Sequence, residues 1–266
     1  MGVIIFNGLS SKDRGIEVWQ PPSYQVPQKD YDTIHIPGRD GDLLIDKESY
    51  KNVPRSYVVS FAKEGRRDFT ILANSLAEWL NSASGYARLE DSYEPEYYRM
   101  ACFQKTIEIA NAYQIAGSAT IEFTCKPQRF LKIGDKPITF IRSKQSIEDS
   151  NNQLILDASG NNIEGFVETQ KFLNNPTRHA SLPIIKIYGS GTGEIQIGNT
   201  TITLLSLSGY LTIDSDIMEV YKDEENCNSK IKFSSNAFPK LYPGLNDISF
   251  SGGVTHVEVI PKWWTI

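Results

Sequence analysis

The chain has 266 residues, of which 40% are hydrophobic and 22% charged, and its formal net charge is −5. This composition indicates a folded globular protein and excludes a largely disordered one. Neither half of the chain is basic, so we expect no nucleic-acid binding, which normally needs a cationic surface. No apolar run approaches the roughly 20 residues of a membrane-spanning helix, so we expect no membrane insertion.

The cysteine pattern indicates free thiols. Cys102, Cys125 and Cys227 are odd in number, and no C-x-x-C motif is present. We expect Cys102 and Cys125 to be buried, since each lies in an alternating strand pattern. The beginning of the chain has no secretory signal, so we expect synthesis in a reducing cytoplasm.

Alternating residues in the first half predict short strands. Ile34 and Ile36 share one face, Leu43 and Ile45 resume the alternation, and the glycine turns at 37–41 lie between them. This pattern is typical of strand, turn and strand. The stretch RSYVVSF at 55–61 also has period two and predicts a half-buried strand.

A single amphipathic helix is predicted at about residues 68–84. Leu72, Leu76 and Trp79 belong to one apolar stripe with three-four spacing. Asp68 is suited to cap the beginning, and Gly85 is suited to the turn that ends the helix. We interpret the stripe as core packing and not as a cofactor site.

The second half predicts an antiparallel β-sandwich. Ile185 and Ile187 alternate, GSGTG at 189–193 is interpreted as a flexible connection or loop, and Gly198-Asn199 is typical of a two-residue hairpin turn. Further alternating pairs bring the count to at least six short strands. The fold class is therefore mostly β with one main helix. We expect two domains, residues 1–132 and 133–266, and assign no role to the polar stretch 143–175.

No pattern in the chain predicts catalysis, a metal or a cofactor. His35, His179 and His256 lack ligand spacing, and GSGTG precedes a strand where a phosphate loop would precede a helix. The aspartates from 40 onward do not fit a calcium loop. The acidic segment LEDSYEPEYYR at 89–99 is interpreted as a solvated loop and not as a glycosidase site. We expect no catalytic residue, and hence no enzyme.

Two tryptophans are candidates for stacking on a saccharide. Trp263 and Trp264 are adjacent, so on a strand they point to opposite faces and at most one joins a binding platform. Packing in the core or in an interface is the favoured alternative.

An ordered series of motifs resembles the distal tail protein (Dit) family of siphophages, the long-tailed, non-contractile bacteriophages. The series covers nearly the whole chain and consists of FNGLSSKDRGI, IPGRDGDL, the LAEWL helix, PIIKIYGSGTGEIQIG, GYLTID, PGLNDISFSGGV and PKWW.

The resemblance implies an N-terminal, ring-forming domain with a β-sandwich or barrel-like structure, and a C-terminal galectin-like β-sandwich. It implies a homohexameric hub at the distal end of the virion tail, assembled in the host cytoplasm. Expected neighbours are the major tail tube protein and a tail-associated lysin or tail fibre protein. A receptor-binding protein or a host cell-wall saccharide is a further possible partner.

A ring of this kind needs head-to-tail contacts between copies. Arg39 and Asp40 lie at the predicted hairpin tip and are candidates for charge-assisted interface bonds. The alternative for both residues is simple solvation. The alternative function for the whole chain is a carbohydrate-binding, lectin-like module.

Overall fold

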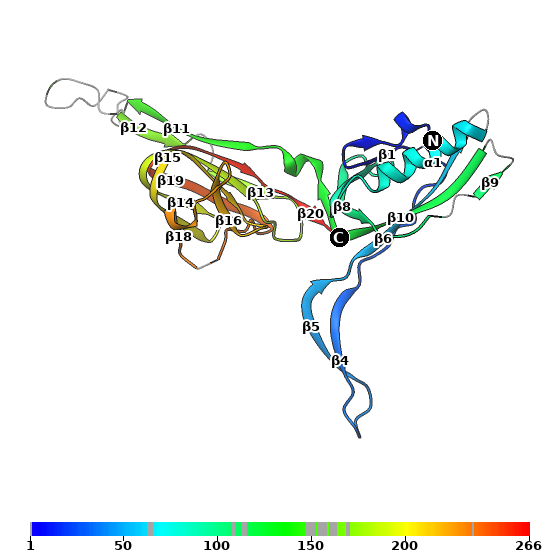
Figure 1. The fold of residues 1–266 in the computed structure, drawn as a ribbon. Coiled ribbons are helices and arrows are strands. Elements are labelled where there is room, and N and C mark those ends of the chain that lie inside the picture. The colour runs from blue at the N-terminus through cyan, green and yellow to red at the C-terminus, as the bar shows by residue number, and fades with distance from the viewer. Residues whose placement is uncertain are drawn as a thin grey trace. The chain divides into compact units, whose positions relative to one another are not determined.

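The structure is a computed structural model that describes residues 2–62, 66–107, 110–112, 116–146, 153, 159, 164–168, 171–235 and 237–266. The chain divides into two compact units, shown in Figure 1. Unit 1 is Met1–Lys132 together with Ile266, and unit 2 is Ile133–Thr265.

Unit 1 is built on one antiparallel sheet in the order β2-β1-β7-β8-β10-β6-β3, with β9 also paired to β10. Its strands are β1 (Ile4–Phe6), β2 (Leu9–Ser10), β3 (Glu17–Val18), β6 (Val53–Ala62), β7 (Ala87–Asp91), β8 (Tyr97–Phe103), β9 (Ala110–Ala112) and β10 (Ala116–Leu131), and a 3₁₀ turn covers Lys12–Arg14. A separate two-stranded sheet joins β4 (Lys29–Ile34) to β5 (Leu43–Tyr50).

The α-helix of unit 1, α1 (Arg66–Leu80), packs on the inner face of this sheet. Leu76 and Trp79 are buried with Ile121 and Phe123 of β10. The Trp79 indole N–H donates to the Leu9 carbonyl at 3.1 Å, which satisfies its polar atom inside the core. The predicted core role of the stripe is therefore confirmed.

The ends of α1 differ from the prediction. The helix begins at Arg66, so Asp68 is its third residue and not the residue before it. It ends at Leu80, where the Asn81 backbone N–H and side-chain amide both donate to the Ala77 carbonyl and the Ser82 N–H donates to the Trp79 carbonyl in a tighter last turn. Gly85 lies five residues beyond the end and does not terminate the helix.

Unit 2 is a nine-stranded antiparallel sheet system in the order β12-β11-β19-β14-β15-β16-β17, with β13 paired to β19 and β18 to β15. The nine strands are β11 (Ile138–Ser146), β12 (Glu164–Glu168), β13 (Phe172–Asn175), β14 (Ile184–Ile197), β15 (Thr200–Asp214), β16 (Glu219–Lys222), β17 (Glu225–Asn226), β18 (Ile231–Phe233) and β19 (Gly244–Ile260). The short strand β20 (Trp264–Thr265) is not part of this sheet system, and 3₁₀ turns cover Lys132–Asp135 and Asn228–Lys230. The predicted fold class, mostly β with one main helix, is confirmed in the described part of the chain.

The long strands of unit 2 have different neighbours at their two ends. One end of β19 pairs with β11, as at Val257 and Phe140, and its other end pairs with β13, as at Asn246 and Leu173. β15 is divided in the same way between β16 and β18. This arrangement fits a β-sandwich whose long strands turn from one layer into the other.

Glycines at the bend of these strands correct the prediction of a flexible connection at 189–193. β14 is continuous through this segment and pairs with both β15 and β19, with register shifts between Gly189 and Gly193. A Cβ on Gly253 would collide with the Ser190 carbonyl oxygen, and one on Gly189 with the Gly253 carbonyl oxygen. The glycines are therefore needed for close strand approach at a bulge and not for mobility.

Candidate assembly surface

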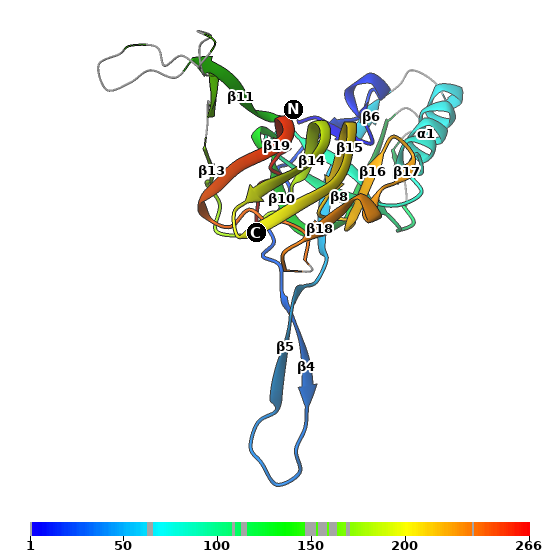
Figure 2. The same ribbon diagram turned by 90° about the vertical axis from the view of Figure 1, so that its left-hand side faces the viewer.

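The β4–β5 hairpin extends away from the rest of unit 1 (Figures 1 and 2). Its strands pair with each other in a register that sets Asp32 opposite Ile45 and Ile34 opposite Leu43. Among the described residues, neither strand has any other ladder partner. Nearly all residues of both strands are exposed, so unit 1 covers neither face of the hairpin.

Apolar side chains on the hairpin are exposed. Ile34, Leu43 and Ile45 share one face and are 45%, 38% and 46% exposed, while Leu44 on the other face is 59% exposed. A two-stranded hairpin is at best marginally stable alone in water. Exposed apolar residues gathered on one element mark a surface that another molecule covers.

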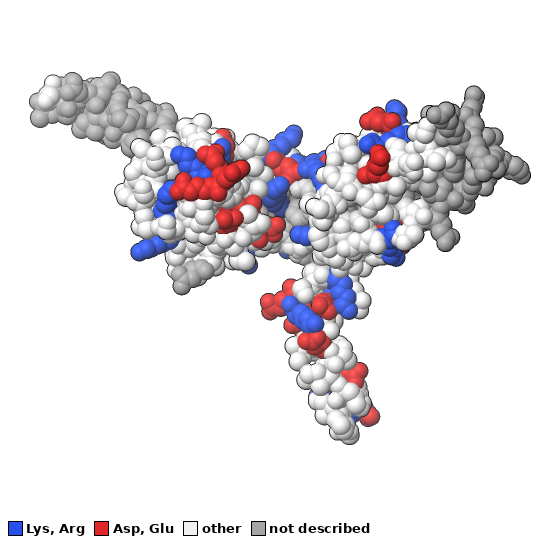
Figure 3. All heavy atoms as spheres, in the orientation of Figure 1, with Lys and Arg blue, Asp and Glu red and all other residues white. Residues whose placement is uncertain are grey.

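Charged residues on the hairpin neutralise one another. Lys29 contacts Asp46 at 2.7 Å, and Lys47 contacts Asp32 at 2.7 Å. The hydrogen bond and the charge of Asp46 raise the pKa of Lys29. In the view of Figure 3, both signs of charge gather near the root of the hairpin, and the part beyond is mostly uncharged apart from a few acidic side chains toward the tip.

Arg39 and Asp40 lie where the sequence predicts, in the loop between β4 and β5, and both are exposed. The Arg39 backbone N–H donates to the Ile36 carbonyl at 3.2 Å and closes the turn. The structure places these two side chains at the hairpin tip. Their contact with a neighbouring copy stays a prediction.

The acidic segment at 89–99 is not a solvated loop, which corrects the prediction. The Arg55 guanidinium lies 2.9 Å from carboxylate oxygens of both Asp91 and Glu94, and Arg129 contacts Glu94 at 2.9 Å. The Tyr57 hydroxyl donates to Asp91 at 2.7 Å. The Arg55 and Asp91 side chains are 6% and 3% exposed, so this is a buried ion network.

The electrostatics of this network indicate a structural role. Burial alone would raise the pKa of Asp91, but hydrogen bonds from Tyr57 and Arg55 outweigh it and hold the pKa below its usual value. The pKa of Glu94 is lowered against burial in the same way, first by Arg99. Both carboxylates are held ionised by arginines, so neither is suited to donate a proton to a substrate.

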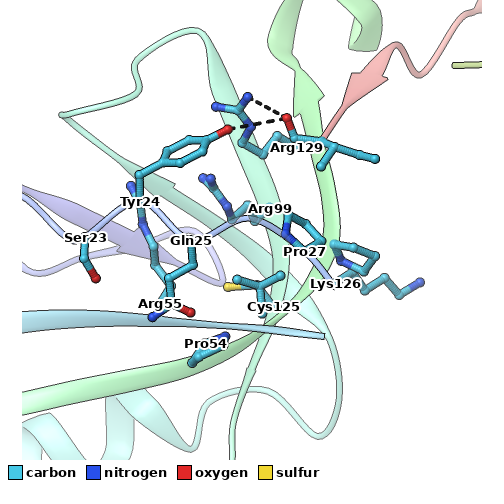
Figure 4. A pocket seen from close by; sticks show the side chains of 13 residues that line it. Ser23, Tyr24, Gln25, Pro27, Pro54, Arg55, Arg99, Cys125, Lys126 and Arg129 are labelled. Carbon is cyan, nitrogen blue, oxygen red and sulfur yellow. Dashed lines mark hydrogen bonds between the residues drawn. The ribbon is translucent and has the colours of Figure 1, made fainter. Parts of the chain in front are cut away.

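A small pocket adjoins this network in unit 1 (Figure 4). Its walls include Tyr24, Pro27, Arg55, Cys125 and Arg129. Its volume is about 10 Å³, roughly the room that one water molecule needs. Burial raises the pKa of the Cys125 thiol to about 12. The pocket therefore contains neither space for a substrate nor a reactive thiolate.

The three cysteines are free and buried, as predicted for Cys102 and Cys125. No group of three or more His, Cys, Asp or Glu residues in the described ranges could hold a metal ion. His35 contacts Asp42 at 3.1 Å on the hairpin, whereas His256 stacks on Tyr188 in unit 2, with 4.1 Å between ring centroids. No helix in the part of the chain that the structure describes is long and apolar enough to span a membrane.

The predicted saccharide-stacking tryptophans differ in burial. Trp263 is 4% exposed and belongs to the core, so its ring offers no open face. Trp264 is partly exposed, its ring stacks on His179 at 4.3 Å, and its indole N–H donates to the Ala180 carbonyl at 2.9 Å. Tyr188 stacks on His256, and the Tyr210 ring lies tilted beside Tyr188 with 6.0 Å between the ring centroids.

Comparisons with known proteins point to phage tails. Residues 8–125 match the phage tail protein RIFT-related domain family. The Dit protein of phage SPP1, described as a paradigm of hub adsorption apparatus in phages infecting Gram-positive bacteria, has a TM-score of 0.69 at 11% identity, with 100% of both chains covered.

Chains of the phage P2 baseplate are also similar. In its activated conformations with Ca and with Sr, they give TM-scores of 0.52 at 11% identity and cover 97% of this chain. No curated protein sequence matches the chain.

Proposed function

We propose that this chain, whose residues 8–125 match the phage tail protein RIFT-related domain family, is a structural component of a siphophage tail tip. The observation that carries the proposal is the Dit fold, which extends over 100% of this chain and of the SPP1 Dit protein. Since the likeness includes both units, the proposal concerns the whole chain and not only its matched domain.

The finer proposal is a homohexameric hub. The hub joins the major tail tube protein on one side to a tail-associated lysin or tail fibre protein on the other, and a receptor-binding protein is a further partner. The protein is assembled in the host cytoplasm and resides in the virion. The uncovered β4–β5 hairpin supports a function that depends on assembly, because its apolar residues need a neighbour.

The proposal includes no enzymatic step. The carboxylates that come closest to an acid pair, Asp91 and Glu94, are neutralised by Arg55 and its neighbours, and the pocket beside them has room for about one water. A saccharide-binding role for unit 2 is the weaker alternative. It rests on Trp264, whose ring is already stacked on His179.

Size-exclusion chromatography with light scattering and negative-stain imaging test the hub. The expected species has six times the 29.9 kDa mass of one chain and a ring-shaped image with six-fold symmetry. A chain that stays monomeric at high concentration, both alone and with the tube and tip proteins, would contradict the proposal. Saccharide titration of the purified chain tests the alternative, and binding lost in Trp264→Ala would favour it.

A further inference from the structure

Unit 1 has an exposed apolar patch besides the hairpin. Trp19 is 65% exposed and Val58 is 40% exposed, and the Trp19 N–H donates to the Val58 carbonyl at 3.0 Å. Their neighbours Val18 and Val59 are both buried, so Trp19 and Val58 point to the outer face of the sheet. These two residues are named the Trp19–Val58 patch.

The patch lies at an edge of the sheet. β6 pairs with β10 along Val53–Ala62, but β3 pairs with β6 only at Val59 and Ser60. An exposed tryptophan beside such a short edge strand is a typical anchor for a protein partner.

Charge distinguishes the hairpin from the body of unit 1. Residues 29–50 contain three Lys and Arg against six Asp and Glu, a net charge of −3. The remainder of residues 1–132 contains thirteen Lys and Arg against eleven Asp and Glu, a net charge of +2. Opposite net charges attract the hairpin of one copy to the body of another, and an acidic hairpin disfavours nucleic acid and anionic membrane.

We propose that the apolar face of the hairpin, formed by Ile34, Leu43 and Ile45, binds the Trp19–Val58 patch of a second copy of this chain. The contact is head-to-tail, because the two surfaces differ and each copy carries one of each. Such contacts close into a ring when the rotation between copies is right. The inference rests on the proposed hub and assigns one of its subunit interfaces.

Two variants remove the two sides of the contact separately. The hairpin variant combines Ile34→Ser, Leu43→Ser and Ile45→Ser, and the patch variant combines Trp19→Ser with Val58→Ser. All five side chains are at least 38% exposed, so both variants should keep the wild-type circular dichroism. The control combines Ile217→Ser and Leu245→Ser, which are 58% and 73% exposed in unit 2.

Light scattering over a concentration series gives the readout. Each variant alone should need at least about tenfold more protein than wild type to assemble, since about a tenfold loss is expected for one buried apolar side chain. The control should assemble as wild type does. A mixture of the two variants should stop at a dimer of mass about twice 29.9 kDa, because only one intact hairpin can meet one intact patch.

The outcomes separate this inference from the hub itself. Wild-type assembly by either variant alone would overturn the docking and leave the hub standing. A mixture that forms full rings, or no dimer, would also overturn the head-to-tail pairing. Failure of the wild-type chain to assemble, alone or with tube and tip proteins, would overturn both proposals.

Discussion

Two hairpins in this molecule share an alternating sequence pattern and differ in what covers them. In the β14–β15 hairpin, Ile185, Ile187 and Ile202 are 0% exposed, whereas Ile34 and Leu43 of the β4–β5 hairpin are 45% and 38% exposed. The alternation of apolar residues along a strand indicates which residues share a face, but it does not indicate whether another layer packs on that face. Other strands of unit 2 cover the first hairpin, whereas the second leaves its apolar side chains exposed in this chain, as expected if another copy covers them.

The largest expected effect comes from β19, the strand that pairs with β14 of the covered hairpin, at the bend where the two strands approach most closely. Gly253→Ala places a Cβ against the Ser190 carbonyl oxygen, where backbone and not a flexible side chain must move. We expect a loss of more than about 4 kcal/mol in the free energy of unfolding of unit 2. Urea denaturation followed by circular dichroism measures it.

The control for that substitution lies at the same bend. A Cβ on Gly191 meets nothing within 4 Å, but its φ is +84°. Gly191→Ala should therefore cost only about 1–2 kcal/mol, the strain of a left-handed residue. Equal losses in the two variants would show that conformational freedom, and not close strand approach, explains these glycines.

The next effect compares a buried ion pair with an exposed one. Asp91→Ala removes the buried acceptor that Arg55 and Tyr57 share and leaves Arg55 with Glu94 alone, and we expect a cost of about 3–5 kcal/mol in the free energy of unfolding. Asp46→Ala removes the exposed partner of Lys29 on the hairpin and should leave the stability unchanged. A stable Asp91→Ala protein would contradict the structural role of the network.

Truncating one isoleucine in each hairpin compares how much the free energy of unfolding depends on a buried and on an exposed apolar side chain. Ile185→Ala should lower the free energy of unfolding by about 2–4 kcal/mol, because it leaves a cavity in the core. Ile45→Ala, at a residue 46% exposed, should change it by no more than about 0.5 kcal/mol in the monomer. A large loss for Ile45→Ala in monomeric protein would mean that the hairpin is covered within its own chain.

The smallest expected effect is the pH dependence of the thermal stability of unit 1. Asp91, Glu94 and Glu90 have folded pKa values below their usual 3.8 and 4.5, since hydrogen bonds from Tyr57 to Asp91 and from arginine and lysine partners to all three outweigh burial. Their stabilisation is full above about pH 4.5 and is lost as the pH falls through the folded pKa values. The thermal midpoint of unit 1 should fall below pH 4, and less steeply in Asp91→Asn. A midpoint that rises on acidification would contradict the directions of these shifts.

Much of the fold was predictable from the sequence because local rules determine it. The Leu72, Leu76 and Trp79 stripe predicts the helix, and Gly198-Asn199 predicts the turn that joins β14 to β15. The resemblance to the distal tail protein family agrees with the match of residues 8–125 to a phage tail domain family and with the fold shared with the SPP1 Dit protein. The predicted ends of the helix, Asp68 and Gly85, differ from the observed ones, Arg66 and Leu80, because the apolar stripe determines the helix but not its terminal residues.

The missed features all depend on contacts between distant segments. Gly189 and Gly253 are 64 positions apart, so their close approach leaves no local signal. Arg55 and Asp91 form a buried pair across 36 positions, which explains why the acidic segment looked solvated. Trp19 was not singled out, because a single exposed aromatic lies outside any alternating pattern.

Hydrogen exchange of the assembled chain against the monomer tests the central claim most directly. We expect the amides of Lys29–Ile34 and Leu43–Tyr50 to exchange quickly in the monomer and to become strongly protected on assembly. The amides of Ile184–Ile197 should be protected in both states. A hairpin that exchanges equally fast in monomer and assembly would contradict the account.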